Sequence, residues 1–199
     1  WDGRGVEAAP TGCDSCGGTP LIVAAFGGSV TLPGGVAITG TDLAAFDPTT
    51  GTWSLYFEGA DVGLTKTISA ATQLPDGDLV LSTTSNGSIS GMAGTSSFTR
   101  NDLIRFTPTS LGADTAGSWT FYLDGSDVGL STSGLSINSA SVLPDGSIVI
   151  GTTSGGDLPG VGFVAPHDLV LFTPASLGTG TAGSWSLYFD GSDMGLSAN

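Results

Sequence analysis

The chain has 199 residues, and acids dominate its charge: 18 Asp and Glu face four Lys and Arg, for a formal net charge of −14. Nucleic acids and anionic membrane surfaces are bound through clustered Lys and Arg, so the sequence excludes both as partners. No apolar run reaches the ~18 residues of a membrane-spanning helix, so we expect no membrane insertion. The 33 glycines, abundant Ser and Thr and scarce Lys, Glu and Gln predict an all-β fold with many turns. The same composition favours an extracellular or cell-surface location.

The first candidate motif is a Cys-x-x-Cys pair, Cys13 and Cys16. A zinc site would need a second pair or histidines, and His167 is the single histidine of the sequence. A c-type haem site would need His directly after the second cysteine, where Gly17 stands. The pair is therefore expected to form a short-loop disulfide, or to remain two free thiols, at the end of a strand.

Several landmarks return with a fixed period. Trp53, Trp119 and Trp185 are evenly spaced by 66 residues. Other landmarks recur in the same order. Tyr56, Tyr122 and Tyr188, and the acidic turn after each Tyr, keep the 66-residue spacing, and the Asp-Leu pairs at 42–43, 102–103 and 168–169 lie 60 and 66 residues apart. This regularity indicates three copies of one structural unit.

The clearest unit predicts four strands, at 136–142, 147–153, 167–174 and 183–191. A Pro-Asp-Gly turn joins the first two, because Pro presets φ and Gly accepts a positive φ. Pro174 is expected to end the third strand, since it cannot donate to a ladder. Alternation predicts that Trp185, Leu187 and Phe189 share one face of the fourth strand. The matching segments are 69–77, 78–84, 101–108 and 117–125 in the second unit, and 11–20, 21–29, 41–48 and 51–59 in the first.

A four-stranded antiparallel unit repeated in this way is typical of a β-propeller blade. We therefore predict an all-β, β-propeller-type array of three four-stranded antiparallel blades: blade one (11–59), blade two (60–125) and blade three (126–191). Residues 1–10 are expected to end a preceding blade, and 192–199 to start the connection to a next one. Propellers usually close with ~4–8 blades, so three are incomplete as a ring and would expose sheet faces. We expect a longer repeat chain, or self-association into a ring or a filament.

Blade one reads Phe26-Gly27-Gly28 and then Phe46-Asp47-Pro48, with Trp53 following. This pattern resembles a Kelch repeat of the galactose-oxidase-type propeller, in which Gly-Gly closes the second strand and an aromatic-Asp-Pro run leads to the Trp of the fourth. Blades two and three depart from it. They carry residues 82–84 and 151–153 in place of Gly-Gly, and six more residues before the Trp. The resemblance implies a fold and not a function.

The acidic turns are the main candidate binding sites. Each places two acids three residues apart, with a serine oxygen in two of the three turns: Glu58 and Asp61; Asp124, Ser126 and Asp127; Asp190, Ser192 and Asp193. Oxygen-only ligands in a flexible turn suit Ca²⁺. The alternative is a solvated β-turn in which Asp caps its own backbone. The expected cofactor is therefore none, or Ca²⁺.

Catalysis has little support in the sequence. His167 stands where the other units have Asn101 and Thr41, so we expect a surface residue at the start of a strand. Every acid lies on a repeat landmark or in a turn. A tryptophan in every unit indicates a core residue in preference to a sugar-stacking platform, and the tyrosines are better candidates for contact between blades.

The loops between the second and third strands, 29–40, 85–100 and 154–166, differ among the units. Function on a repeated scaffold usually lies in such loops. The first of two features there is an N-glycosylation sequon at Asn86. The second is a set of apolar side chains expected to be exposed for partner contact: Met92, Phe98, Leu158, Val161 and Phe163.

These observations predict a non-enzymatic extracellular repeat module for structure or interaction, which self-associates or belongs to a longer repeat chain. The alternative is a calcium- or carbohydrate-binding propeller module of a secreted enzyme, with a glycan as a possible partner. A hydrolase with its site at a propeller mouth is a third class.

Overall fold

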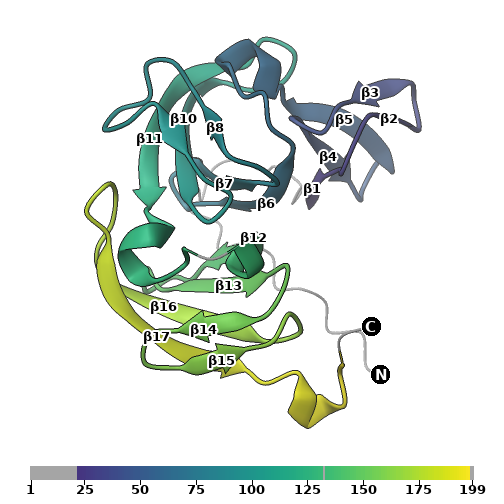
Figure 1. Ribbon diagram of the computed structural model, residues 1–199. Coiled ribbons are helices and arrows are strands. Elements are labelled where there is room, and N and C mark those ends of the chain that lie inside the picture. Colours follow the sequence, from purple (N-terminus) through teal and green to yellow (C-terminus); the bar gives the residue numbers. More distant parts are fainter. Residues whose placement is uncertain (1–21, 132, 198–199) are drawn as a thin grey trace.

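The structure is a computed structural model that describes residues 22–131 and 133–197 (Figure 1). Three antiparallel sheets follow one another along the chain, each with its strands in chain order. Among the described residues the helical elements are short 3₁₀ turns, and none is a helix long and apolar enough to span a membrane. The predicted all-β fold of propeller-type blades is confirmed, and the described blades do not close into a ring (Figure 1).

The strands of each blade are as follows. Blade one has β1 (Ile22–Ala25), β4 (Leu43–Asp47) and β5 (Thr52–Phe57). Blade two has β6 (Ile68–Gln73), β7 (Leu79–Thr83), β10 (Leu103–Ser110) and β11 (Ala116–Leu123). Blade three has β12 (Ile137–Val142), β13 (Ile148–Thr152), β16 (Leu169–Ser176) and β17 (Ala182–Phe189). The strand predicted at 11–20, with Cys13 and Cys16, and the predicted end of a preceding blade at 1–10 lie outside the described residues.

A small two-stranded hairpin lies between the second and third large strands of each blade, which in blade one are β1 and β4. The hairpins are β2 (Val30–Leu32) with β3 (Val36–Ile38), β8 (Gly87–Ser88) with β9 (Ser97–Phe98), and β14 (Gly156–Leu158) with β15 (Gly162–Val164). The 3₁₀ turns are η1 (Gly59–Val62), η2 (Gly125–Val128), η3 (Ser133–Leu135) and η4 (Ser192–Met194). Three of them, η1, η2 and η4, coincide with the acidic turns.

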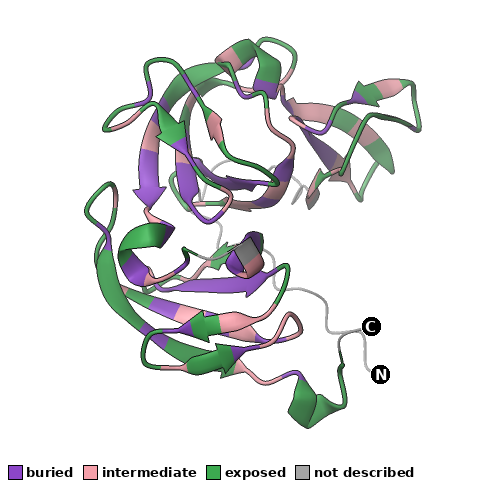
Figure 2. Ribbon diagram, viewed as in Figure 1, coloured by how far each residue is buried: buried purple, intermediate pink, exposed green. Residues whose placement is uncertain are grey.

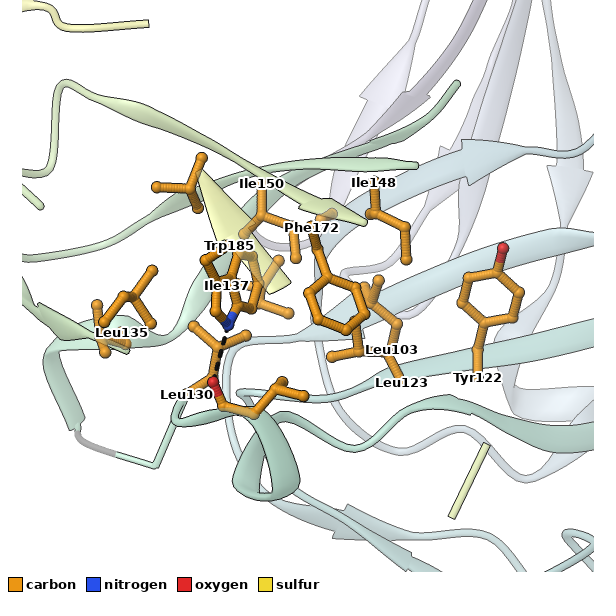
Figure 3. Close-up of a cluster of buried hydrophobic side chains, with 14 of the residues drawn as sticks. Leu103, Tyr122, Leu123, Leu130, Leu135, Ile137, Ile148, Ile150, Phe172 and Trp185 are labelled. Atoms are coloured by element: carbon orange, nitrogen blue, oxygen red, sulfur yellow. Dashed lines mark hydrogen bonds between the residues drawn. The ribbon is translucent and has the colours of Figure 1, made fainter. Parts of the chain in front are cut away.

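Two hydrophobic clusters fill the spaces between consecutive blades. Between blades one and two, Leu43 and Phe57 pack with Leu79, Ile104 and Phe106. Between blades two and three, the cluster joins side chains from both sheets (Figure 3), including Leu103, Leu123, Leu130, Ile137, Ile148, Ile150 and Phe172. Buried residues accordingly lie along the inner strands of each sheet (Figure 2). Each blade therefore depends on its neighbours for burial, as in other repeat arrays.

Pro174 does not end the third strand of blade three, contrary to the prediction, and Pro108 does not end that of blade two, whereas β4 of blade one does end just before Pro48. Strand β16 continues through Pro174 to Ser176, and β10 continues through Pro108 to Ser110. A β-bulge separates each proline from the next paired residue. Proline is tolerated at a bulge because the regular ladder is interrupted there.

The predicted alternation along the fourth strand fails at its end. In β11, Trp119 and Phe121 face blade one, but Leu123 joins Tyr122 in the cluster facing blade three. The cause is a bulge: Leu103 pairs with Leu123 while Ile104 pairs with Phe121. Blade three has the same bulge, with Leu169 opposite Phe189 and Val170 opposite Leu187. The bulge thus turns the strand end toward the following blade.

Candidate functional site: the face between blades

In blades two and three, the connection between the third and fourth strands extends to the preceding blade. We call residues 107–118 the arm of blade two and residues 173–184 the arm of blade three. Both are six residues longer than the matching segment of blade one, 47–52. The Gly112 N–H donates to the Tyr56 carbonyl at 2.9 Å, and the Gly178 N–H donates to the Tyr122 carbonyl at 2.8 Å. Each arm therefore reaches back to the preceding blade.

A threonine on each arm binds the acidic turn of the preceding blade. The Thr115 N–H donates to Asp61 Oδ2 at 3.1 Å, and Thr115 Oγ1 accepts from the Glu58 N–H at 2.9 Å. The same pair of bonds joins Thr181 to Asp127 Oδ2 at 3.0 Å and to the Asp124 N–H at 2.9 Å. The second acid of each turn is thus a contact between blades.

The repeated tryptophan completes this arrangement. The Trp119 indole N–H donates to the Val62 carbonyl at 3.0 Å, and the Trp185 indole N–H donates to the Val128 carbonyl at 2.8 Å (Figure 3). Both rings are buried at the boundary with the preceding blade. The carbonyl of Val62 or Val128 lies in the 3₁₀ turn that also carries the clasped acid. We call these four hydrogen bonds, from the Gly, Thr (two) and Trp of one blade, the clasp.

The Asp of each Asp-Leu landmark holds its own acidic turn in place. Asp102 accepts from the Thr99 N–H at 2.6 Å, from Thr99 Oγ1 at 2.9 Å and from the Gly125 N–H at 2.9 Å. Burial raises the pKa of the Asp102 carboxyl, although the bonds from Thr99 and Gly125 oppose that shift. Asp42 and Asp168 make the same bond to the N–H of Gly59 and Gly191. These acids are structural supports of the turn.

The first acid of each later turn caps its own backbone. Asp124 Oδ1 accepts from the Ser126 N–H at 3.0 Å and from Ser126 Oγ at 2.6 Å. Asp190 and Ser192 form the same pair at 3.0 and 2.6 Å. The Ser192 hydroxyl holds the pKa of Asp190 below its usual range, against a weaker raising effect of burial. Within the described ranges, no three His, Cys, Asp or Glu side chains come together as a metal-binding group.

The matching face of blade three is open. Tyr188, Met194 and Leu196, here called the free face, are 55%, 70% and 50% exposed. Their counterparts in blade two, which join the cluster shared with blade three, are 9%, 8% and 0% exposed: Tyr122, Val128 and Leu130. The difference arises because blade three covers blade two, whereas no described residue covers blade three in the same way. The free face is therefore a candidate binding surface.

The expected contact residues in the loops are wrong at three positions. Met92 and Phe98 are buried in the cluster between blades one and two, and Leu158 is buried in the next cluster. The small hairpins fold back over the sheets, so alternate side chains of these short strands point into the core. Phe163 is 69% exposed, as expected, and Val161 is half-buried against the cluster.

Two further predicted residues have defined surroundings. Asn86 is exposed, and its Oδ1 accepts from the Arg100 N–H at 3.1 Å. His167 is half-buried rather than on the surface, with Nε2 3.9 Å from Asp168 Oδ1. It packs beneath the backbone of Gly191, where the turn of blade three meets the start of its third strand. Neither residue is part of the clasp.

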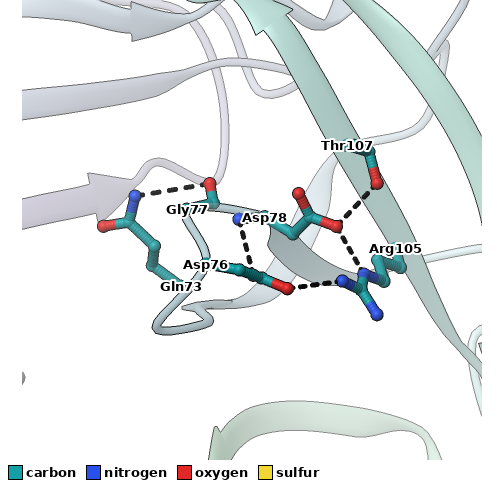
Figure 4. Close-up of polar contacts among 6 residues, drawn as sticks. All are labelled: Gln73, Asp76, Gly77, Asp78, Arg105 and Thr107. Atoms are coloured by element: carbon teal, nitrogen blue, oxygen red, sulfur yellow. Dashed lines mark hydrogen bonds and ion pairs between the residues drawn. The ribbon is translucent and has the colours of Figure 1, made fainter. Parts of the chain in front are cut away.

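Blade two also carries an ion-paired cluster that blade three lacks (Figure 4). Arg105 binds Asp78 Oδ2 at 2.5 Å and Asp76 Oδ2 at 2.6 Å, and Thr107 Oγ1 donates to Asp78 Oδ2 at 2.6 Å. Burial alone would lower the pKa of Arg105, but the hydrogen bond and charge of Asp78 outweigh it and raise it. One of the few cations of the chain is thus used to satisfy a buried acid.

The clasp threonines were missed in the sequence. Their signal is a Gly-x-x-Thr pattern at matching positions of the two arms, Gly112 with Thr115 and Gly178 with Thr181, which blade one lacks. The inserted six residues were recognised as a departure from a known repeat, but their contact with another blade depends on three-dimensional structure.

Comparisons with known proteins add little to this geometry. No family model matches the chain, and no curated protein sequence matches it. Among solved structures, the chain is similar to one described as "YCF48 bound to D1 peptide", with 14% identity and a TM-score of 0.31, over 89% of this chain and 55% of that chain. The chain thus spans little more than half the length of that structure. What the described residues form is a β-propeller-type array of antiparallel blades with one uncovered face.

Proposed function

We propose that the chain is a non-enzymatic repeat module of an extracellular structure, and that it works by binding a further blade on the free face of blade three. The observation that carries this proposal is the contrast at the free face. Three large side chains are half exposed or more there, and their counterparts are almost completely buried one blade earlier. Contiguous exposed apolar side chains of this kind mark interaction surfaces in soluble proteins.

The polar groups support the same function. Three of the acids, Asp102, Asp127 and Asp168, already hold turns or clasp threonines. The Kelch-like character of blade one is part of the proposal, supported by its short arm. The covering blade can come from a further repeat or from a second copy in a ring or filament.

A chain with one added blade tests the proposal. Residues 198 and 199 are replaced with a copy of residues 66–131, which continues the repeat in phase after Ser197. Hydrogen–deuterium exchange is then followed in peptides covering 182–196, whose sequence stays unique in the longer chain. We expect exchange there to slow to the rate of the matching segment, 116–130, in the unextended chain. Unchanged exchange at 182–196 would contradict the proposed function.

A further inference from the structure

We propose that the free face of blade three selects its partner: it accepts a blade with a long Gly-x-x-Thr arm, as in blade two, and does not accept the short-armed blade one of a second copy. This inference rests on the proposed function and names the class of partner. The partner is a further long-armed repeat, so head-to-tail binding of identical chains through blade one is not the way in which the face is covered.

The first argument is that both described interfaces use the clasp. The Gly112, Thr115 and Trp119 groups bind blade one, and the equivalent groups of blade three bind blade two at nearly the same distances. Thr115 and Thr181 are both buried by this contact. A long arm is therefore a constant part of how one blade covers another in this chain.

The second argument is that blade three already has the receiving half of the clasp in place. The Leu196 N–H donates to the Gly191 carbonyl at 2.9 Å, matching Leu130 to Gly125 at 2.7 Å. Gly195 has a φ of +77°, in the left-handed region used by Gly129 at the same point of η2. The turn is thus preorganised, which lowers the cost of binding. Among the described residues the Asp193 carboxylate makes no hydrogen bond or ion pair, whereas Asp127 holds Thr181.

The third argument is the match between the free face and blade one. Strand β5 and its turn read TWSLYFEG, and β17 and its turn read SWSLYFDG. Tyr56 and Phe57, which join the cluster shared with blade two, therefore have identical counterparts in Tyr188 and Phe189. Blade two covers the first of these surfaces, so a blade of that kind has a complementary surface for the second.

Blade one cannot supply the clasp. Its short arm closes on itself, because Asp47 Oδ1 accepts from the Thr49 N–H at 2.8 Å and the Asp47 carbonyl accepts from the Gly51 N–H at 2.8 Å. This arm lacks the six inserted residues, so blade one has no counterpart of Gly112 or Thr115. Of the covering blade's contributions to the four clasp bonds, blade one has only the indole N–H of Trp53. A second copy docked through blade one would leave Asp193 without its partner.

The experiment compares three extended chains by exchange at 182–196. The first carries the copy of 66–131 described above. In the second, residues 107–118 within the copy are replaced with residues 47–52, which gives it a short arm. The third carries the intact copy together with Asp193→Ala, and Asp157→Ala is its matched control because Asp157 is an exposed acid away from the free face. The doubled peptide covering β7 shows whether the copy is folded, since an unfolded copy exchanges half of that signal at once.

We expect strong protection with the long arm, little with the short arm, and about tenfold faster exchange after Asp193→Ala, as loss of a charged hydrogen bond implies. Equal protection by both arms would overturn the inference and leave the proposed function standing. No protection by the long arm, or a copy that stays unfolded beside a folded parent chain, would overturn both. Light scattering of the 199-residue chain gives a second check. A polymer that Leu196→Asp dissolves would support the proposed function and contradict the choice of partner.

Discussion

Replacing Asp127 with alanine should weaken the contact between blades two and three, whereas the same change at Asp193 should leave the stability of the 199-residue chain unchanged. Asp127 Oδ2 accepts the Thr181 N–H at 3.0 Å, and Thr181 is only 5% exposed. Without the carboxylate that buried N–H loses its protein partner, at a cost of about 1–3 kcal/mol. Because Asp127 itself is exposed and water can reach its side of the bond, we expect the lower half of that range, about 1–2 kcal/mol.

The measurement is urea unfolding followed by tryptophan fluorescence, with exchange of the Thr181 amide as a local probe. A repeat array need not unfold in one step, so the local probe decides the case. A loss of about 1.4 kcal/mol corresponds to exchange faster by about tenfold. Asp61→Ala should act in the same way on blades one and two, through Thr115. Equal effects at Asp127 and Asp193, or none at Asp127, would refute the assignment of the second acid to the clasp.

Three further outcomes are expected. Gly183→Ala should destabilise the chain by about 1–3 kcal/mol, because a Cβ there would overlap the Thr173 carbonyl and the Phe172 ring, while Gly180→Ala meets no atom and should be neutral in thermal unfolding. Arg105→Leu should destabilise the chain by about 1–3 kcal/mol, because it leaves the buried Asp78 without its cation. Adding Asp78→Ser should recover most of this loss, since blade three has Ser and Leu at these two positions. If the two changes destabilise the chain additively, Arg105 and Asp78 are not an energetically coupled pair. EDTA and added Ca²⁺ should not move the thermal midpoint, because the second acids of η1 and η2 are held by threonine N–H groups; a rise with Ca²⁺ would restore the calcium expectation.

The strands and turns of the blades could be predicted from the sequence, because their burial and geometry follow from short local patterns of residues. Strand β7 is apolar on both faces and is completely buried, as expected of an inner strand. The Pro-Asp-Gly turns place Gly77 and Gly146 at a positive φ, which is the conformation that the pattern predicts. Even the missing cover on blade three was expected from counting repeats.

The other features depend on folded loops, a bulge and contacts between distant residues, and a local sequence pattern does not reveal these. Met92 and Phe98 looked exposed because they lie in a loop rich in Gly and Ser, but the loop folds onto the core cluster. Pro174 was expected to end a strand because the bulge that tolerates it has no sequence mark of its own. Asp127 was assigned to a solvated turn or to calcium, since its partner, Thr181, is 54 residues away.

The backward reach of the arm has a consequence for how the protein is made. Synthesis proceeds from the N-terminus, and domains generally fold as units in that order. The Thr115 arm can bind blade one only after blade two has been translated, and the Thr181 arm comes one blade later still. Each blade therefore gains its last contacts from the blade that is translated after it, and nascent chains should gain stability one blade at a time. The youngest blade on the ribosome always has one surface waiting for sequence that has not yet been translated.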